Sequence, residues 1–246
     1  MANPTSPKPE AAELNAAFEA LKSYAQGSSR GALVPIDQAV KASLGDEPAR
    51  AALEQRLLSA LHYGGSAAAV EFICSKLALI GSKPSVTPLA TLLGKPEFAT
   101  AARTVLETIP GDSPARALRK ALPKVEGLQK IGVIHSLGAR RDEESVRPLT
   151  ALLKSEDSGV AAAAVAALGD IATSKAAKVL LKFQPKAPPI LQPKFANALL
   201  VCAERLLAAG RKADARNLYR SLATSAQPRH VQQAAARGLE VCSSSR

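Results

Sequence analysis

The three histidines are the first residues to examine for chemistry, because an imidazole can act as a general base or bind a metal ion. They are His62, His135 and His230, and they lie far apart in the sequence. None has a second histidine or a carboxylate three or four residues away, the spacing that places two metal ligands on one helical face. His135 lies between Ile134 and Leu137 and is most simply a packed or edge histidine. The sequence therefore predicts neither a metal site nor a bound cofactor.

Cysteine chemistry is equally unsupported by the spacing. Cys74, Cys202 and Cys242 show no CxxC pattern and leave an odd number, which argues against a disulfide framework or a zinc knuckle. Cys74 lies in EFICSKLALI, where a free cysteine behaves as a small buried hydrophobe. A pairing of Cys202 with Cys242 stays open, but a structural role is favoured for all three.

No motif of an enzyme is present: the sequence has no GxSxG, HExxH, P-loop or GxGxxG pattern. The acidic run 142–144 follows Arg140 and Arg141 in a turn between two expected helices. A turn does not bury carboxylates as acid–base chemistry would require, so the run is better interpreted as an N-cap for a helix beginning near Glu143. We therefore expect a protein that is not an enzyme.

The net charge of +11 is concentrated in the last third of the chain. Residues 1–100 are neutral and residues 101–172 carry +1, whereas residues 173–246 hold 13 Lys and Arg against 3 Asp and Glu, a net +10. Such a basic end can attract an acidic protein, a nucleic-acid backbone or an anionic membrane. The alternative is that it only solubilises the outer face of a helical array.

The composition predicts the elements that must position these residues. The chain has 49 Ala and 32 Leu, both strong helix formers, but only 5 Phe and no Trp. Strands favour Val, Ile, Thr and aromatic residues, so a β-sandwich or barrel is excluded. An aromatic share of 3% also argues against a stacking platform for single-stranded nucleic acid.

From residue 84 the chain repeats itself. PSVTPLATLLG at 84–94 matches ESVRPLTALLK at 144–154 without a gap, and weaker copies begin near Ser113 and Ser174. Three second helices are expected between them, at 97–109, 125–138 and 158–172. A period near 30 residues, with two short helices in each unit, predicts a helical-repeat array.

This pattern, S-V-x-P-L-x-x-L-L followed by V-x-x-A-A-x-x-A-L-G-x-I, resembles the HEAT repeat, above all the short bacterial PBS-lyase HEAT-like form. The best copy spans 144–171, and the resemblance covers 67–184. It implies an all-α fold, a right-handed α-solenoid of about twelve helices in HEAT-like pairs, but no particular activity. The second helix of this copy begins DSGVA at 157–161, so the Arg that commonly closes an ion-pair ladder in the family is missing.

Two features of the repeats carry structural expectations. Pro88 and Pro148 lie inside first helices, where a missing N–H bends the helix, as is common in this family. Buried leucine ladders are expected at Leu89, Leu92, Leu93, Leu149, Leu152 and Leu153.

The C-terminal part is similar to a tetratricopeptide unit, although an ordinary capping hairpin is an equally open interpretation. Pro228 lies within one residue of that motif's closing proline. The matching positions are Ala203, Gly210, Ala215, Tyr219 and Leu222.

These patterns give four expected segments: a disordered leader at 1–8, an N-terminal helical cap at 9–66, the repeat array at 67–184 and a TPR-like cap at 185–246. No segment reaches the roughly 20 apolar residues of a membrane span. The Pro-rich start resembles the stretch after a cleaved signal and favours export or the periplasm, whereas three unpaired cysteines favour a reducing compartment. A monomer is expected.

Function follows from shape: a curved helical-repeat surface without catalytic residues favours a non-catalytic protein-binding scaffold of unknown partner. The alternative is a polyanion or nucleic-acid binder that uses the basic C-terminal third. A remote alternative is a bilin-lyase-like enzyme, which the PBS-lyase resemblance suggests although no residue identifies a bilin pocket. HEAT-like DNA glycosylases use tryptophans, which this chain lacks.

The expected contact residues are arginines at the rim of the array. The helix at 158–172 is small on every side and almost without charge, so neighbours should enclose it and close the centre of the concave face. Recognition would then depend on rim arginines, whose planar forks pair with carboxylates or phosphates. These candidates, which could also simply solvate the outer face, are Arg140, Arg141, Arg147, Arg211, Arg216 and Arg220.

Overall fold

A computed structural model of the chain describes residues 9–62, 65–224 and 227–244. Within these ranges the protein contains fourteen α-helices and five short 3-10 segments, without a strand. The all-α class and the succession of helix pairs are therefore confirmed, with fourteen helices in place of about twelve. The expected leader at 1–8 lies outside the described residues. The helices form two compact units, residues 1–125 and 126–246, here called the N-terminal and C-terminal units.

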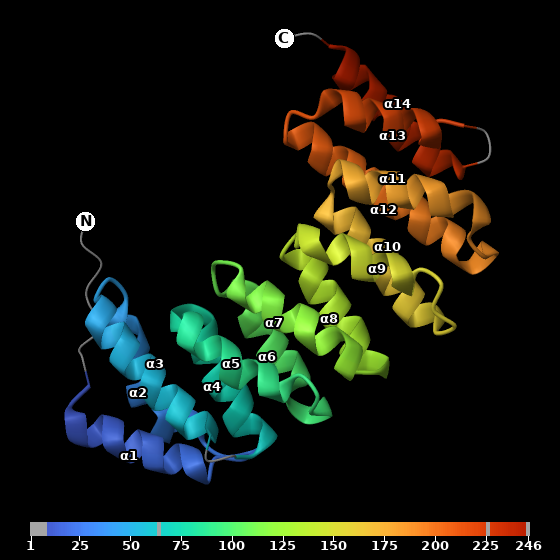
Figure 1. Cartoon of the computed structure of the whole chain (residues 1–246). Coiled ribbons are helices and arrows are strands. Elements are labelled where there is room, and N and C mark those ends of the chain that lie inside the picture. Colours follow the sequence, from blue (N-terminus) through green and yellow to red (C-terminus); the bar gives the residue numbers. More distant parts are fainter. Residues whose placement is uncertain (1–8, 63–64, 225–226, 245–246) are drawn as a thin grey trace. The chain divides into compact units, whose positions relative to one another are not determined.

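The N-terminal unit stacks its helices in two layers, visible in blue to green in Figure 1. In one layer α3 contacts α5 and α5 contacts α7, while in the other α2 contacts α4 and α4 contacts α6. The helices are α1 (Ala11–Lys22), α2 (Val34–Ser43), α3 (Glu47–His62), α4 (Ala67–Ile80), α5 (Lys83–Leu92), α6 (Pro96–Thr108) and α7 (Ser113–Ala121).

The C-terminal unit repeats this plan. One layer holds α8, α10 and α12, and the other holds α9, α11 and α13, with α14 packed on α12 and α13. The helices are α8 (Gly127–Ala139), α9 (Val146–Leu152), α10 (Ser158–Ile171), α11 (Ser174–Phe183), α12 (Gln192–Ala208), α13 (Lys212–Leu222) and α14 (Arg229–Ser243). None of the described helices is both long and apolar enough to cross a bilayer.

Short-range capping explains where several helices begin. Asp46 accepts a hydrogen bond from the Ala49 amide (3.0 Å) one residue before α3, and Asp157 accepts from the amides of Gly159 and Val160 at the start of α10. These side chains satisfy amide donors that have no partner within the helix. The cap at Asp157 ends the preceding turn and begins the most buried helix of the chain.

The leucine ladders are confirmed at five of six positions, because Leu152 is only half-buried. Pro88 lies inside α5 as expected. Pro148 lies nearer the start of its helix than expected: residues 143–145 form a 3-10 turn, α9 begins at Val146, and Pro148 falls in the first turn. There a missing N–H costs no helical hydrogen bond, so the expected proline bend does not apply to α9.

A buried carboxylate joins α3 to the start of α5. Glu54 is 2% exposed and accepts hydrogen bonds from the Ser82 amide and the Ser82 hydroxyl, both at 2.7 Å. It also accepts one from the hydroxyl of Ser85, a serine of the repeat pattern that is itself fully buried. Three donors from the start of α5 thus converge on a single side chain of α3.

The repeat serines of the C-terminal unit also donate to carboxylates. Ser145 donates to Asp142, so the expected capping residue of the acidic run binds a hydroxyl, without a side-chain cap to a backbone amide. Ser174, at the start of α11, donates to Asp214 of α13 at 2.9 Å. Ser85 and Ser174 therefore link neighbouring helices, whereas the bond of Ser145 stays within its own turn.

Two glycines let the helices of one layer touch through their backbones. A Cβ added to Gly138 of α8 would lie 2.9 Å from the Cα of Ala167 in α10. One added to Gly169 of α10 would lie 2.9 Å from the Cα of Ala198 in α12 and 2.7 Å from its carbonyl oxygen. Gly138 and Gly169 each follow the Leu of the sequence pattern in successive repeats. The Leu-Gly pair therefore marks the point where neighbouring helices of this layer touch.

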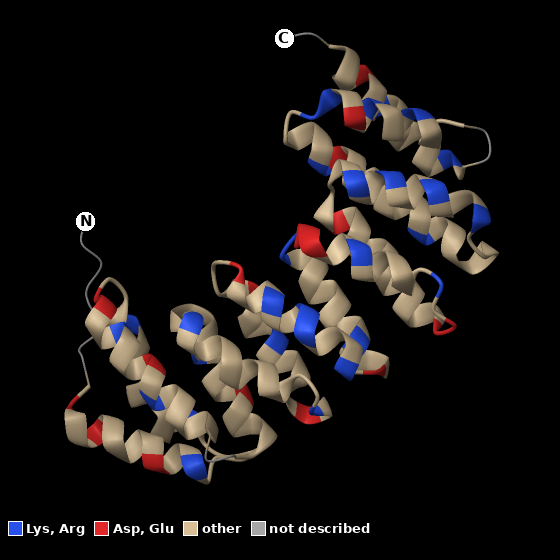
Figure 2. Cartoon of the chain, in the orientation of Figure 1, with Lys and Arg blue, Asp and Glu red and all other residues tan. Residues whose placement is uncertain are grey.

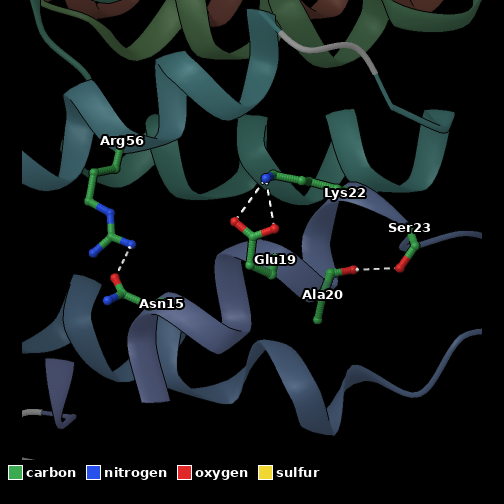
Figure 3. A network of polar contacts seen from close by, with 6 residues as sticks. All are labelled: Asn15, Glu19, Ala20, Lys22, Ser23 and Arg56. Atoms are coloured by element: carbon green, nitrogen blue, oxygen red, sulfur yellow. Dashed lines mark hydrogen bonds and ion pairs between the residues drawn. The ribbon is translucent and has the colours of Figure 1, made fainter. Parts of the chain in front are cut away.

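The first helix is held to α3 by an arginine. The guanidinium of Arg56 donates to the Asn15 side-chain oxygen at 2.9 Å (Figure 3). It also lies over the Phe18 ring, 4.3 Å from its centre. The neighbouring ion pair between Lys22 and Glu19 (2.7 Å) stays within α1. The contacts of Arg56 with α1 support the expected N-terminal helical cap, whose boundary at residue 66 stays a prediction.

Candidate interaction surfaces

Three of the six predicted arginines gather at the turn between α8 and α9. Arg140 is half-buried, whereas Arg141 and Arg147 are exposed. Arg141 has a left-handed backbone (φ 51°), and its amide donates to the Gly138 carbonyl while the Asp142 amide donates to that of Leu137. This is the Schellman arrangement that ends a helix, here with arginine in the place that glycine usually takes. The end of α8 thus directs Arg141 into solvent.

The other three arginines have different environments. Arg211 donates to the Ser174 hydroxyl (2.7 Å) and to the Asp214 carboxylate, which links α13 to α11. Arg216 donates to the Cys242 carbonyl near the end of α14 (2.6 Å), a position where a cation complements the helix terminus. Arg220 is exposed. Arg211 and Arg216 therefore have internal partners, and a binding role for the six arginines stays a prediction.

The helix expected to be enclosed is α10. Between 159 and 171 every residue is buried or half-buried, and Ala164, Val165 and Leu168 are fully buried. Helices α8, α9, α11 and α12 surround it. A helix with no polar face is satisfied only in such a position, so this prediction is confirmed. Exposed recognition groups must lie on other helices.

The histidines show no convergent arrangement. His62, His135 and His230 are all exposed, so His135 is not packed into the core. Over the described ranges, no three His, Cys, Asp or Glu side chains gather as metal ligands would. The three cysteines are buried and free, which answers the open question of a bond between Cys202 and Cys242.

Burial sets the chemistry of two of these thiols. Loss of solvation raises the pKa of Cys74 from 9.0 to about 12, with a smaller contribution from Glu71. Burial likewise raises the pKa of Cys202 to about 12, with Asp214 adding to the effect. Because the thiolate is the reactive form, both cysteines behave as core residues and not as nucleophiles.

Alkylation provides a test of these two pKa values. We expect iodoacetamide at mildly alkaline pH to leave Cys74 and Cys202 unmodified in the folded protein and to modify both in denaturant, as measured by mass spectrometry of peptides. Since the folded-state pKa exceeds the unfolded value, the stabilisation is complete below pH 9 and is lost as the pH rises towards 12. Rapid modification of either thiol in the folded chain would contradict the assignment.

A groove that the sequence analysis missed lies between α5 and α7. It has a volume of about 560 Å³. Its basic lining residues, all exposed, are Lys83, Arg116, Lys120 and Lys124. Its other lining residues are small or apolar, apart from three hydroxyl side chains, and none of them is acidic. The signal in the sequence was the spacing 116, 120, 124, which places Arg116 and Lys120 on one side of α7, away from buried Leu118, and Lys124 in the 3-10 turn that follows.

The corresponding layer of the C-terminal unit carries a second basic surface, here called the α11 lysine row. Its members are the exposed side chains Lys175, Lys178, Lys182 and Lys186, and residues 173–186 contain no Asp or Glu. Figure 2 shows the Lys and Arg positions along α11 and, in the other unit, along α7. Residues 173–186 thus carry four cations and no carboxylate, whereas the predicted Arg211 and Arg216 have partners within the unit.

Comparison with known families supports the repeat assignment. Residues 115–199, about a third of the chain, match the family model for HEAT repeats. The match begins in α7 and ends in α12, and so includes the best sequence copy. No curated protein matches the chain significantly. The family match and the stacked helix pairs together support a HEAT-repeat protein, and HEAT repeats generally serve as protein-interaction scaffolds.

Proposed function

We propose that the protein is a non-catalytic scaffold that binds a partner protein on the helical layers formed by α3, α5 and α7 and by α9, α11 and α13. The observation that carries this proposal is the unequal use of the two layers. In the α8–α10–α12 layer, the glycine contacts and the burial of α10 serve packing between helices. The exposed cations of the α5–α7 groove and of the α11 lysine row lie on the other layers. Each of these two layers is an exposed row of helices, which suits binding to an extended segment of a partner.

We further propose that the C-terminal segment, residues 185–246, forms a TPR-like cap. Ala203, Ala215, Tyr219 and Leu222 are buried, as the motif spacing requires, and Gly210 has a left-handed backbone (φ 74°) between α12 and α13. The ring of Tyr219 lies against Gly238 of α14. These contacts support a terminal hairpin that closes the array. Further parts of the proposal are that the array is right-handed, that its repeats are of the bacterial PBS-lyase-like form and that the protein is a monomer.

Position-specific photocrosslinking tests the scaffold proposal. A photoreactive amino acid would be placed at Thr87 on α5 or Lys178 on α11, and at Thr100 on α6 or His135 on α8 as matched exposed controls. We expect protein adducts from at least one of the first two positions in the native extract and a yield several-fold lower from both controls. Equal yields from all four positions would contradict the assignment of the binding layer, and no protein adduct at any position would contradict a scaffold.

A second candidate function, polyanion binding, is favoured specifically by the α11 lysine row. Lysines without nearby carboxylates can neutralise phosphates, and such binding weakens steeply as salt rises. Nuclease treatment of the same extract separates the two functions. Adducts at Lys178 that disappear after nuclease treatment would support polyanion binding, whereas adducts that persist at physiological salt support a protein partner.

A further inference from the structure

We propose that the α5–α7 groove is a binding site for an acidic, extended segment of a partner protein. This inference rests on the proposed scaffold function and names the chemistry of its ligand. The groove is built entirely within the N-terminal unit, by α5, α7 and the residues that follow each helix. Its volume of about 560 Å³ lies in the range of sites that accept a ligand of a few residues.

Charge is the first property that selects the ligand. Among the described residues, no ion pair involves Lys83, Arg116, Lys120 or Lys124. No carboxylate belongs to the lining, although the unit as a whole contains many acidic residues. The four cations are therefore not neutralised from within the groove. Unpaired cations around a concave surface attract and orient an anion.

Spacing is the second property. Arg116 and Lys120 are one turn apart on α7, which places their Cβ atoms about 6 Å from each other. Lys124 ends the 3-10 turn that continues the helix. In an extended chain, alternate side chains point the same way and are separated by about 7 Å. A segment with Asp or Glu at alternate positions therefore matches the spacing of these cations.

The floor of the groove is the third property. It is formed by small and apolar side chains, among them Val86, Ala90, Ala117 and Val125. Such a floor can bury the apolar residues that alternate with the acidic ones. The lining contains no aromatic ring on which a base could stack, and a nucleic-acid duplex is much wider than a groove of this volume. Together these features favour an acidic peptide over nucleic acid.

Binding of a defined peptide tests the proposal. The probe is a fluorescein-labelled peptide in which three glutamates alternate with valine and leucine, measured by fluorescence anisotropy against the full-length chain. We expect the double variant Arg116→Glu/Lys120→Glu to weaken binding at least tenfold. The variant Lys194→Glu/Arg237→Glu changes the net charge equally at exposed positions of α12 and α14, outside the proposed binding layers, and its affinity should stay within about threefold of the wild type.

An uncharged variant separates shape from charge. Ala117 is half-buried in the lining, so Ala117→Leu should fill the groove and weaken binding at least fivefold without altering the net charge. Circular dichroism confirms that each variant is folded before it is compared. Loss of binding in both groove variants supports the site.

Other outcomes overturn the proposal. An equal loss of affinity in the Lys194→Glu/Arg237→Glu variant would show that the effect comes from net charge alone. If the wild-type chain bound the glutamate peptide no more tightly than the same peptide with glutamine in place of glutamate, the groove would have no preference for an anion. Competition by a single-stranded oligonucleotide as strong as by unlabelled peptide would assign the groove to nucleic acid. Protein crosslinks at Lys178 but none at Thr87 would leave the scaffold standing while the groove assignment fails.

Discussion

Replacing Gly169 with alanine is expected to lower the free energy of unfolding of the C-terminal unit by about 2 kcal/mol. The added methyl group would lie 2.7 Å from the Ala198 carbonyl oxygen and 2.9 Å from its Cα. Both are backbone atoms, so relief requires α10 and α12 to move apart. Alanine gains up to about 1 kcal/mol over glycine in a helix, and overpacking of a tight core costs roughly 1–3 kcal/mol. Because backbone atoms cannot rotate away as a side chain can, we expect the overpacking cost at Gly169 to lie at the upper end of this range.

Urea denaturation followed by circular dichroism measures this change. Gly138→Ala should act in the same direction, because its methyl group would meet Ala167 of α10. Gly94→Ala is the matched control, since nothing lies within 4 Å of its added Cβ and its backbone is not left-handed. A Gly169→Ala protein as stable as the Gly94→Ala protein would show that the helices are not in backbone contact.

The second large effect is expected at Glu54. Replacing Glu54 with alanine should destabilise the N-terminal unit by about 3 kcal/mol, because an unpaired buried donor costs roughly 1–3 kcal/mol. The substitution removes the acceptor of the Ser82 amide and of the hydroxyls of Ser82 and Ser85. Ser85 is fully buried, so water cannot readily replace the lost carboxylate.

A double-mutant cycle isolates this contact. Ser85→Ala in the Glu54→Ala background should cost less than Ser85→Ala alone, since its partner is already absent. Gln55→Ala, on an exposed face of the same helix, should change the stability by less than about 0.5 kcal/mol. Additive effects of the Glu54 and Ser85 substitutions would mean that the buried hydrogen bond contributes no coupling energy.

Much of the fold could be predicted because helical periodicity is a local property. The expected helix at 97–109 matches α6, and the enclosed helix at 158–172 matches α10, both to within one residue at each end. Pro148 was expected to bend α9 but lies in its first turn, because the sequence does not show that a 3-10 turn delays the start of the helix. The division into caps and an array at 66/67 and 184/185 stays a prediction, since local patterns do not reveal which helices cluster into compact units.

The candidate site was less predictable, because it depends on contacts between distant residues. Counting charge directed attention to the basic last third, yet Arg211 and Arg216 there have partners within the unit. The α5–α7 groove lies in the long segments 1–100 and 101–172, whose summed charges of 0 and +1 hide the local cluster, and folding adds Lys83 to the cations of α7. Charge summed along a chain does not report charge at a surface.

The glycine contacts have a mechanical consequence for the C-terminal unit. Interaxial distances depend on the side chains at the contact, and Gly138 and Gly169 set them to the short end in the α8–α10–α12 layer. Helices α9, α11 and α13 contain no glycine, so side chains separate their axes. A stack that is narrower on one side bends towards that side. We therefore expect the C-terminal unit to curve towards the α8–α10–α12 layer, and a methyl group at Gly138 or Gly169 to reduce that curvature.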